Sequence, residues 1–100
     1  MRTVVVLAEA AEDIERARDF YDDQDPGIGD YCADSLVADI ASLALHHGIH
    51  FRHFGFFRML AHRFPFGIYY HDTETETQVF AVLDLRRDPN WIRKELSWRG

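Results

Sequence analysis

The sequence predicts one α+β domain over residues 1–100, with the element order β-α-α-β-β-β-α. In this fold a helical hairpin packs on an antiparallel sheet and a short helix ends the chain. Apolar residues recur at helical spacing in the first half, and aromatic and β-branched runs separated by polar turns fill the second half. A chain of 100 residues with 47% hydrophobic content can bury one modest core.

The first half predicts a strand followed by two helices. Residues 2–7 form a β-branched run that is typical of a strand. Over residues 8–24, apolar residues recur at intervals of three and four, which predicts an amphipathic helix. These apolar residues are Ala10, Ile14, Ala17 and Tyr21. Residues 25–29 contain a proline and two glycines, which stop the helix. A second helix is predicted over residues 31–47 with Gly48 as its C-cap, so the two helices form an antiparallel hairpin.

The second half predicts an antiparallel meander of three strands and a short closing helix. A loop over residues 50–55 leads into the meander. The predicted strands are residues 57–64, 66–71 and 78–83. The polar run 72–76 is the turn between the last two strands. Asp88 is a favoured N-cap and Pro89 a favoured first helical residue, so the closing helix is predicted to begin there.

The net charge of −6 conceals an asymmetry between the two halves. Residues 1–50 contain three arginines against eleven Asp and Glu residues, a net charge of −8, whereas residues 51–100 contain eight Arg and Lys residues against six acidic ones, a net charge of +2. A nucleic acid should therefore meet the second half, because the first half repels phosphates. The acidic half suits docking to a basic protein partner, or its carboxylates are simply a solvated helix face.

Several classes of site and location are disfavoured by composition. Cys32 is the only cysteine, so no internal disulfide can form, which fits a cytoplasmic protein. No apolar run approaches the ~18 residues that cross a bilayer, so we expect no membrane partner. Histidines crowd residues 46–53, but no cysteine lies near them, so we expect neither a metal site nor a cofactor.

Four motifs occur in one order along the chain. They are Ala11-Glu12-Asp13-Ile14 with Ala17, Phe20 and Tyr21; Pro26-Gly27-Ile28-Gly29 with Tyr31; Arg63-Phe64-Pro65 with Ile68-Tyr69-Tyr70; and Arg86-Arg87-Asp88-Pro89 with Trp91. In this order and spacing the chain resembles the RelE/ParE superfamily of type II toxin–antitoxin toxins, and within it the ParE-like plasmid stabilisation proteins. The resemblance covers nearly the whole chain.

The resemblance implies the α+β fold described above and a toxin that a cognate antitoxin holds inactive in a hetero-oligomer. Two activities are known within this fold. RelE-like members cut mRNA in the ribosomal A site. ParE-like members poison DNA gyrase and are not nucleases.

The nuclease activity would require a general base, a general acid and cations for the crowded phosphate. The candidate catalytic residues are Arg63, Arg86, Arg87 and His62. Three departures count against this activity. Gly67 stands where RelE-like members usually carry a strand arginine. Lys94 is the only lysine of the chain, so the lysine pair of RelE-like members is missing. RelE-like members carry a catalytic aromatic residue or histidine near the C-terminus. Here the candidate is Trp91, whose indole cannot transfer a proton.

We therefore expect a ParE-like toxin that binds a protein target, with DNA gyrase as the expected target. The expected target-binding residues are Arg86, Arg87, Trp91 and Trp98, and the expected antitoxin-binding residues are Arg58, Phe64, Tyr69 and Tyr70. Two alternatives remain open: a ribosome-dependent mRNA endoribonuclease, and a toxin-fold binding module with weak or no toxicity. Arg86 and Arg87 also have a purely structural interpretation, as ion-pair partners of Asp84 and Asp88.

Overall fold

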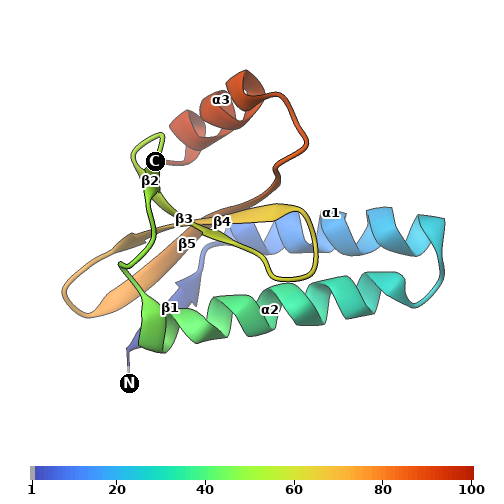
Figure 1. The fold of residues 1–100 in the computed structure, drawn as a ribbon, viewed down its shortest axis with the longest axis horizontal. Helices are drawn as coiled ribbons and strands as arrows, with labels where there is room; N and C mark the ends of the chain where they lie inside the picture. Colours follow the sequence, from blue (N-terminus) through green and yellow to red (C-terminus); the bar gives the residue numbers. More distant parts are fainter. Residues whose placement is uncertain (1) are drawn as a thin grey trace.

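The computed structural model describes residues 2–100, and its helices and strands lie in three layers (Figure 1). The elements in chain order are β1 (Thr3–Val6), α1 (Ala8–Gln24), α2 (Ile28–His46), β2 (Arg52–His53), β3 (Phe56–Leu60), β4 (Phe66–Asp72), β5 (Glu76–Asp84) and α3 (Pro89–Arg99). The α1–α2 hairpin lies on one face of the sheet and α3 on the other. The α+β fold class is confirmed. Within residues 2–100, no helix combines the length and apolarity needed to cross a membrane.

The sheet has the strand order β1-β5-β4-β3-β2. Strands β2 to β5 pair antiparallel in chain order, which is the predicted meander. The expectation of a wholly antiparallel sheet is corrected at one edge, where β1 pairs parallel to β5, with Thr3 opposite Glu76 and Val6 opposite Val79. The helical hairpin makes this possible, because it carries the chain across one face of the sheet between β1 and the meander.

The first helix begins and ends at the predicted residues, but other boundaries differ. The second helix begins at Ile28 rather than at residue 31, because a neighbouring helix caps it: the Asp22 carboxylate accepts hydrogen bonds from the backbone N–H groups of Gly27 (3.2 Å) and Gly29 (2.7 Å). The predicted loop 50–55 contains the two-residue strand β2, and β3 ends at Leu60 rather than at residue 64.

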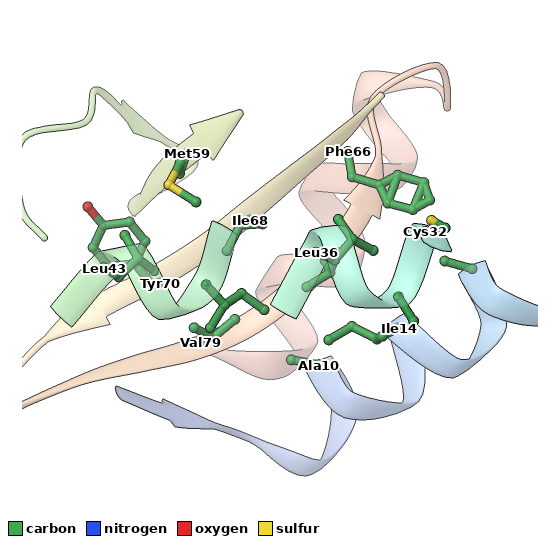
Figure 2. Packing of buried hydrophobic residues seen from close by; sticks show 14 residues of the cluster. Ala10, Ile14, Cys32, Leu36, Leu43, Met59, Phe66, Ile68, Tyr70 and Val79 are labelled. Atoms are coloured by element: carbon green, nitrogen blue, oxygen red, sulfur yellow. The ribbon is translucent and has the colours of Figure 1, made fainter. Parts of the chain in front are cut away.

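Two apolar clusters hold the layers together. The larger lies between the helical hairpin and the sheet, and Figure 2 shows how its side chains meet. Its labelled members are Ala10, Ile14, Cys32, Leu36, Leu43, Met59, Phe66, Ile68, Tyr70 and Val79. The smaller lies beneath α3 and consists of Phe56, Tyr69, Ala81, Leu83, Ile92 and Leu96. Because side chains alternate along β4, Tyr70 enters the first cluster and Tyr69 the second.

Candidate functional site

The candidate site begins at the outer edge of β5, which extends beyond its neighbour β1. Val6 is the last residue of β1 and pairs with Val79, so the edge from Phe80 onward has no strand beside it. Two side chains satisfy backbone groups there. The Asp13 carboxylate of α1 accepts a hydrogen bond from the Val82 N–H (2.9 Å), and the Arg99 guanidinium of α3 donates to the Phe80 carbonyl (3.3 Å).

Asp13 and Arg99 also pair with each other. The Arg99 Nη2 lies 3.0 Å from the Asp13 Oδ1, and the two side chains are only 5% and 3% exposed. Glu95, one turn earlier in α3, accepts a third hydrogen bond from Arg99 at 3.0 Å. Burial alone would lower the pKa of Arg99, but the hydrogen bonds and charges of these two carboxylates raise it instead. The buried pair therefore joins α1, β5 and α3.

A cleft of about 620 Å³ lies over this edge, between α1 and α3. Its lining residues are Asp13, Arg16, Ala17, Phe20, Phe66, Val82, Leu83, Asp84, Arg87, Trp91, Glu95 and Arg99. Two of them, Arg87 and Trp91, were predicted from the sequence to bind the target, and the Arg87 guanidinium stacks 3.7 Å above the Trp91 ring. On the opposite wall, α1 contributes Arg16 and the half-exposed ring of Phe20.

Arg86 lies apart from this cleft, at an aromatic ridge. Its guanidinium pairs with Asp84 at 2.7 Å, and this hydrogen bonding holds the pKa of the Asp84 carboxyl below its usual value. The same guanidinium reaches the Tyr21 hydroxyl at 3.5 Å. The Tyr21 ring packs edge-on against Phe64, which continues the ridge toward the loop between β3 and β4.

Arg63 approaches the other end of that ridge. Its guanidinium donates to the Tyr31 hydroxyl at 2.6 Å, and the Tyr31 ring packs against Phe64. The structure therefore places Arg63 and Arg86 on one aromatic ridge, and Arg87 with Trp91 in the neighbouring cleft.

His62 lies elsewhere, where the sheet meets α2. Its Nδ1 lies 2.7 Å from one oxygen of Asp39, and its backbone N–H donates to the other oxygen at 2.9 Å. Asp39 is nearly buried, whereas the imidazole is 75% exposed. His62 lines a second cavity of about 520 Å³ together with Arg58. Across residues 2–100, no group of three or more His, Cys, Asp or Glu residues is arranged to hold a metal ion.

Four residues were predicted to contact an antitoxin, and the structure divides them. Tyr69 and Tyr70 are fully buried on opposite faces of the sheet, so neither ring is available to a partner in this conformation. Burial raises the pKa of the Tyr69 hydroxyl, and the adjacent Arg58 guanidinium partly offsets that rise. Arg58 and Phe64 are half-buried and keep some exposed surface. Trp98, predicted to bind the target, is one of the most exposed large side chains.

Gly67 is closely surrounded by side chains. A Cβ there would lie 3.0 Å from both Leu85 and Tyr69 and 3.2 Å from Arg58. An arginine at this position would displace these neighbours. The close packing around residue 67 therefore agrees with the absence of an arginine there.

Together, the three layers, the meander and the closing helix form the α+β fold that the sequence predicted. A solved chain described as "Chromosomal ParDE TA system from P. aeruginosa" shares this fold with a TM-score of 0.73. The match covers 82% of this chain and 94% of that chain at 18% sequence identity. No family model matches the sequence, and the search of curated proteins found no significant match. The comparison establishes the fold.

Proposed function

We propose that this chain is the ParE-like toxin of a type II toxin–antitoxin module and inhibits growth by binding a protein target, with DNA gyrase as that target. The fold shared with a chain of a ParDE toxin–antitoxin system is the observation that carries the proposal. A cognate antitoxin would neutralise the toxin in a cytoplasmic hetero-oligomer, and such a module would serve plasmid stabilisation.

The chemistry of the cleft supports binding rather than catalysis. Each carboxylate that lines it is already engaged by arginine: Asp13 and Glu95 by Arg99, and Asp84 by Arg86. The lowered pKa of Asp84 keeps this group ionised at neutral pH, so it cannot act as a general acid there. What remains at the surface is a cationic and aromatic pair, Arg87 on Trp91, of the kind enriched at protein interfaces.

Arg58 and Phe64 are the two proposed antitoxin contacts that keep exposed surface. Phe64 forms part of the aromatic ridge beside Arg63 and Arg86, so an antitoxin segment bound there would also cover positive charge. An acidic and apolar segment fits this surface by charge complementarity.

One observation favours the endoribonuclease alternative. The Asp39 carboxylate holds the Nδ1 of His62, which leaves the Nε2 of an exposed imidazole as an acceptor, the arrangement of an oriented general base. The other nuclease candidates do not join it. Arg87 lines the first cavity and His62 the second, whereas Arg63 and Arg86 line neither.

The test pairs a DNA gyrase supercoiling assay with an mRNA cleavage assay on programmed ribosomes. We expect inhibited supercoiling and intact mRNA from the purified protein. Arg87→Glu should weaken the inhibition at least tenfold, because it removes the cation over Trp91 and places a negative charge there. The matched control is Arg93→Glu, which makes the same charge change at an exposed position of α3.

Each outcome decides between the candidate functions. Cut mRNA with normal supercoiling would replace the proposal with the nuclease, and His62→Gln would then be the variant expected to lose activity. Inactivity in both assays, together with normal growth when the protein is induced in cells, would favour a binding module without toxicity. Full inhibition by a correctly folded Arg87→Glu variant would show that the proposed target contact is wrong.

A further inference from the structure

The segment between α2 and β2 contacts the sheet at the hydroxyl of Tyr70. The ring of Tyr70 lies among the side chains of the larger apolar cluster (Figure 2). The Gly48 N–H donates a hydrogen bond to the Tyr70 hydroxyl at 2.8 Å, and the Nδ1 of His50 lies 2.6 Å from the same oxygen. The His50 ring also packs edge-on against the Tyr70 ring, with the two ring centres 5.6 Å apart. One hydroxyl therefore binds two residues of the segment.

The hydrogen bonds at this hydroxyl require a neutral His50. A backbone N–H can only donate, so the hydroxyl accepts from Gly48, and its own hydrogen is left to donate to the Nδ1 of His50. The Nδ1 then carries a lone pair, and the ring proton is on Nε2. A second proton on His50 would occupy Nδ1 and displace the hydrogen of the tyrosine. Because Tyr70 is fully buried, its displaced O–H donor would be costly to leave without an acceptor.

The surroundings of His50 also oppose a positive charge. His50 lines the second cavity together with Arg58 and three other histidines, His46, His53 and His62. Among residues 2–100, no aspartate or glutamate lines this cavity. Burial and the neighbouring His46 lower the pKa of His50, and burial and Arg58 lower the pKa of His53. Protons added to the cavity would therefore repel one another and the arginine.

Two carboxylates lie near the cavity, but each is already bound to a different histidine. The Oδ2 of Asp72 lies 2.9 Å from the Nδ1 of His47, and Arg2 approaches the same carboxylate at 4.0 Å. Asp39 binds both the ring and the backbone N–H of His62. Neither carboxylate is therefore free to offset a new charge in the cavity.

Little apolar packing holds residues 48–51 in place. Ile49 is 74% and Phe51 87% exposed. Apart from the contacts at Tyr70, the segment is held by the Phe51 carbonyl, which accepts a hydrogen bond from the Arg58 N–H at 3.0 Å. Gly48 has a φ of +78°, a conformation that glycine adopts readily and that allows the chain to turn after α2. Residues 48–51 can therefore leave Tyr70 without exposing apolar side chains of the core.

We propose that residues 48–51 form an acid-sensitive latch, which is closed while a neutral His50 accepts from Tyr70 and opens the second cavity when His50 is protonated. His47, paired with Asp72, stays in place and forms the hinge. Because the pKa of His50 is lowered in the folded chain, the stability of the closed latch is complete above the ordinary histidine value of 6.5 and is lost as the pH falls through the folded-state pKa. His53 responds to acid in the same direction.

The latch would make one part of the surface depend on pH. Arg58 lines the second cavity and donates its backbone N–H to Phe51, so opening changes the surroundings of a proposed antitoxin contact. This consequence rests on the proposed function, whereas the latch itself does not.

Nuclear magnetic resonance of the full chain tests the latch directly. At pH 7.5 the ring of His50 should carry its proton on Nε2 and none on Nδ1, and its titration should give a pKa below 6.5. Hydrogen exchange of the Gly48 amide, corrected for the intrinsic effect of pH on exchange, reports the opening. Its protection should fall by about fivefold or more between pH 7.5 and pH 5, which is the factor expected for the loss of one hydrogen bond.

His50→Asn is the decisive variant, because the asparagine side-chain oxygen can accept from Tyr70 but does not titrate. This variant should keep its Gly48 protection down to pH 5. The matched control is His71→Asn, since His71 is also a half-buried histidine but stacks on Phe56, outside the second cavity. The control should show the same loss of protection as the unsubstituted chain.

Three results would each overturn the latch. One is a His50 that titrates at or above 6.5 or carries a proton on Nδ1 at pH 7.5. Another is equal protection of the Gly48 amide at the two pH values. The third is an unchanged loss of protection in His50→Asn, which would assign the opening to a different group. None of these measurements involves gyrase, mRNA or an antitoxin, so the proposed function is judged separately.

Discussion

Removing the Asp13 carboxylate should destabilise the fold more than any surface substitution. Asp13→Ala takes away the acceptor of two hydrogen bonds from Arg99 and of one from the Val82 N–H. Both groups lie where water cannot replace what is lost: the Arg99 side chain is 5% exposed, and the Asp13–Val82 hydrogen bond is buried. Breaking one side of a buried ion pair typically costs about 3–5 kcal/mol. The unpaired amide accounts for about 1–3 kcal/mol of this total.

The effect should be large relative to the whole fold. A domain of this size has a free energy of unfolding of about 5–15 kcal/mol, so the variant would lose a major fraction of its stability. At roughly 4–8 °C per kcal/mol, the midpoint of thermal unfolding should fall by about 15 °C or more. Asp13→Asn should cost less than Asp13→Ala, because its side-chain carbonyl can still accept from Val82.

Urea unfolding followed by circular dichroism measures these differences. Arg16→Ala is the matched control, because Arg16 also pairs with Asp13 (2.7 Å) but is 64% exposed, and it should change stability by about 0.5 kcal/mol or less. A double-mutant cycle with Arg99→Met should give a coupling energy above about 1 kcal/mol. A loss below about 1 kcal/mol for Asp13→Ala would refute the idea that the buried pair anchors α3.

Three further predictions concern single residues. Burial alone would raise the pKa of Asp72, but hydrogen bonding, first from Thr77, lowers it. The stabilising contribution of Asp72 is therefore present above about pH 4 and is lost as the pH falls through the folded-state pKa. Asp72→Asn should remove this loss of stability at acid pH, as measured by urea unfolding from pH 7 to pH 2. Burial raises the pKa of the Cys32 thiol to about 11, so a disulfide reagent should label it only after denaturant is added. Gly29→Ala would place a Cβ 2.3 Å from the Arg18 carbonyl, so the urea midpoint should fall by the equivalent of about 1–3 kcal/mol, and an unchanged midpoint would contradict the close helix contact.

The sequence correctly predicted those helix ends that are determined by residues within or directly beside the helix. The periodicity of α1 gave both of its ends, and Asp88 caps α3 as expected by accepting from the Asn90 N–H at 2.9 Å. The start of α2 was missed because its cap, Asp22, belongs to the preceding helix. The N-cap residue itself, Gly27, has no side chain, so no capping side chain stands immediately before the helix.

The candidate site was predicted only where its residues are close in sequence. Arg87 and Trp91, both named from the sequence as target-binding residues, lie four positions apart and stack on each other. Asp13 and Arg99 were missed because 86 positions separate them. One signal was present: Asp13 shares the apolar face of α1 with Ala10, Ile14 and Ala17, and a carboxylate there needs a buried partner.

The two tyrosines of β4 show why strand alternation alone does not predict which aromatic rings are exposed. A sheet covered on one face exposes every second side chain, and on that basis about half of the aromatic residues of β4 and of the loop before it should be available to an antitoxin. In the structure α3 covers part of the second face as well, so Tyr69 is buried under Ile92 and Leu96 while Tyr70 is buried against the hairpin. The third layer removes both from the surface.

The position of the proposed target contact depends on how α3 is held. This helix buries Ile92 and Leu96 and packs part of Trp91 against the same cluster, and the Arg99–Asp13 pair fixes its last turn to α1. The position of the Trp91 ring therefore depends both on this packing and on an ion pair at the opposite end of the same helix. Asp13→Ala should then weaken target inhibition together with stability, whereas Arg87→Glu should weaken inhibition alone. The two variants separate the positioning of the contact from the contact itself.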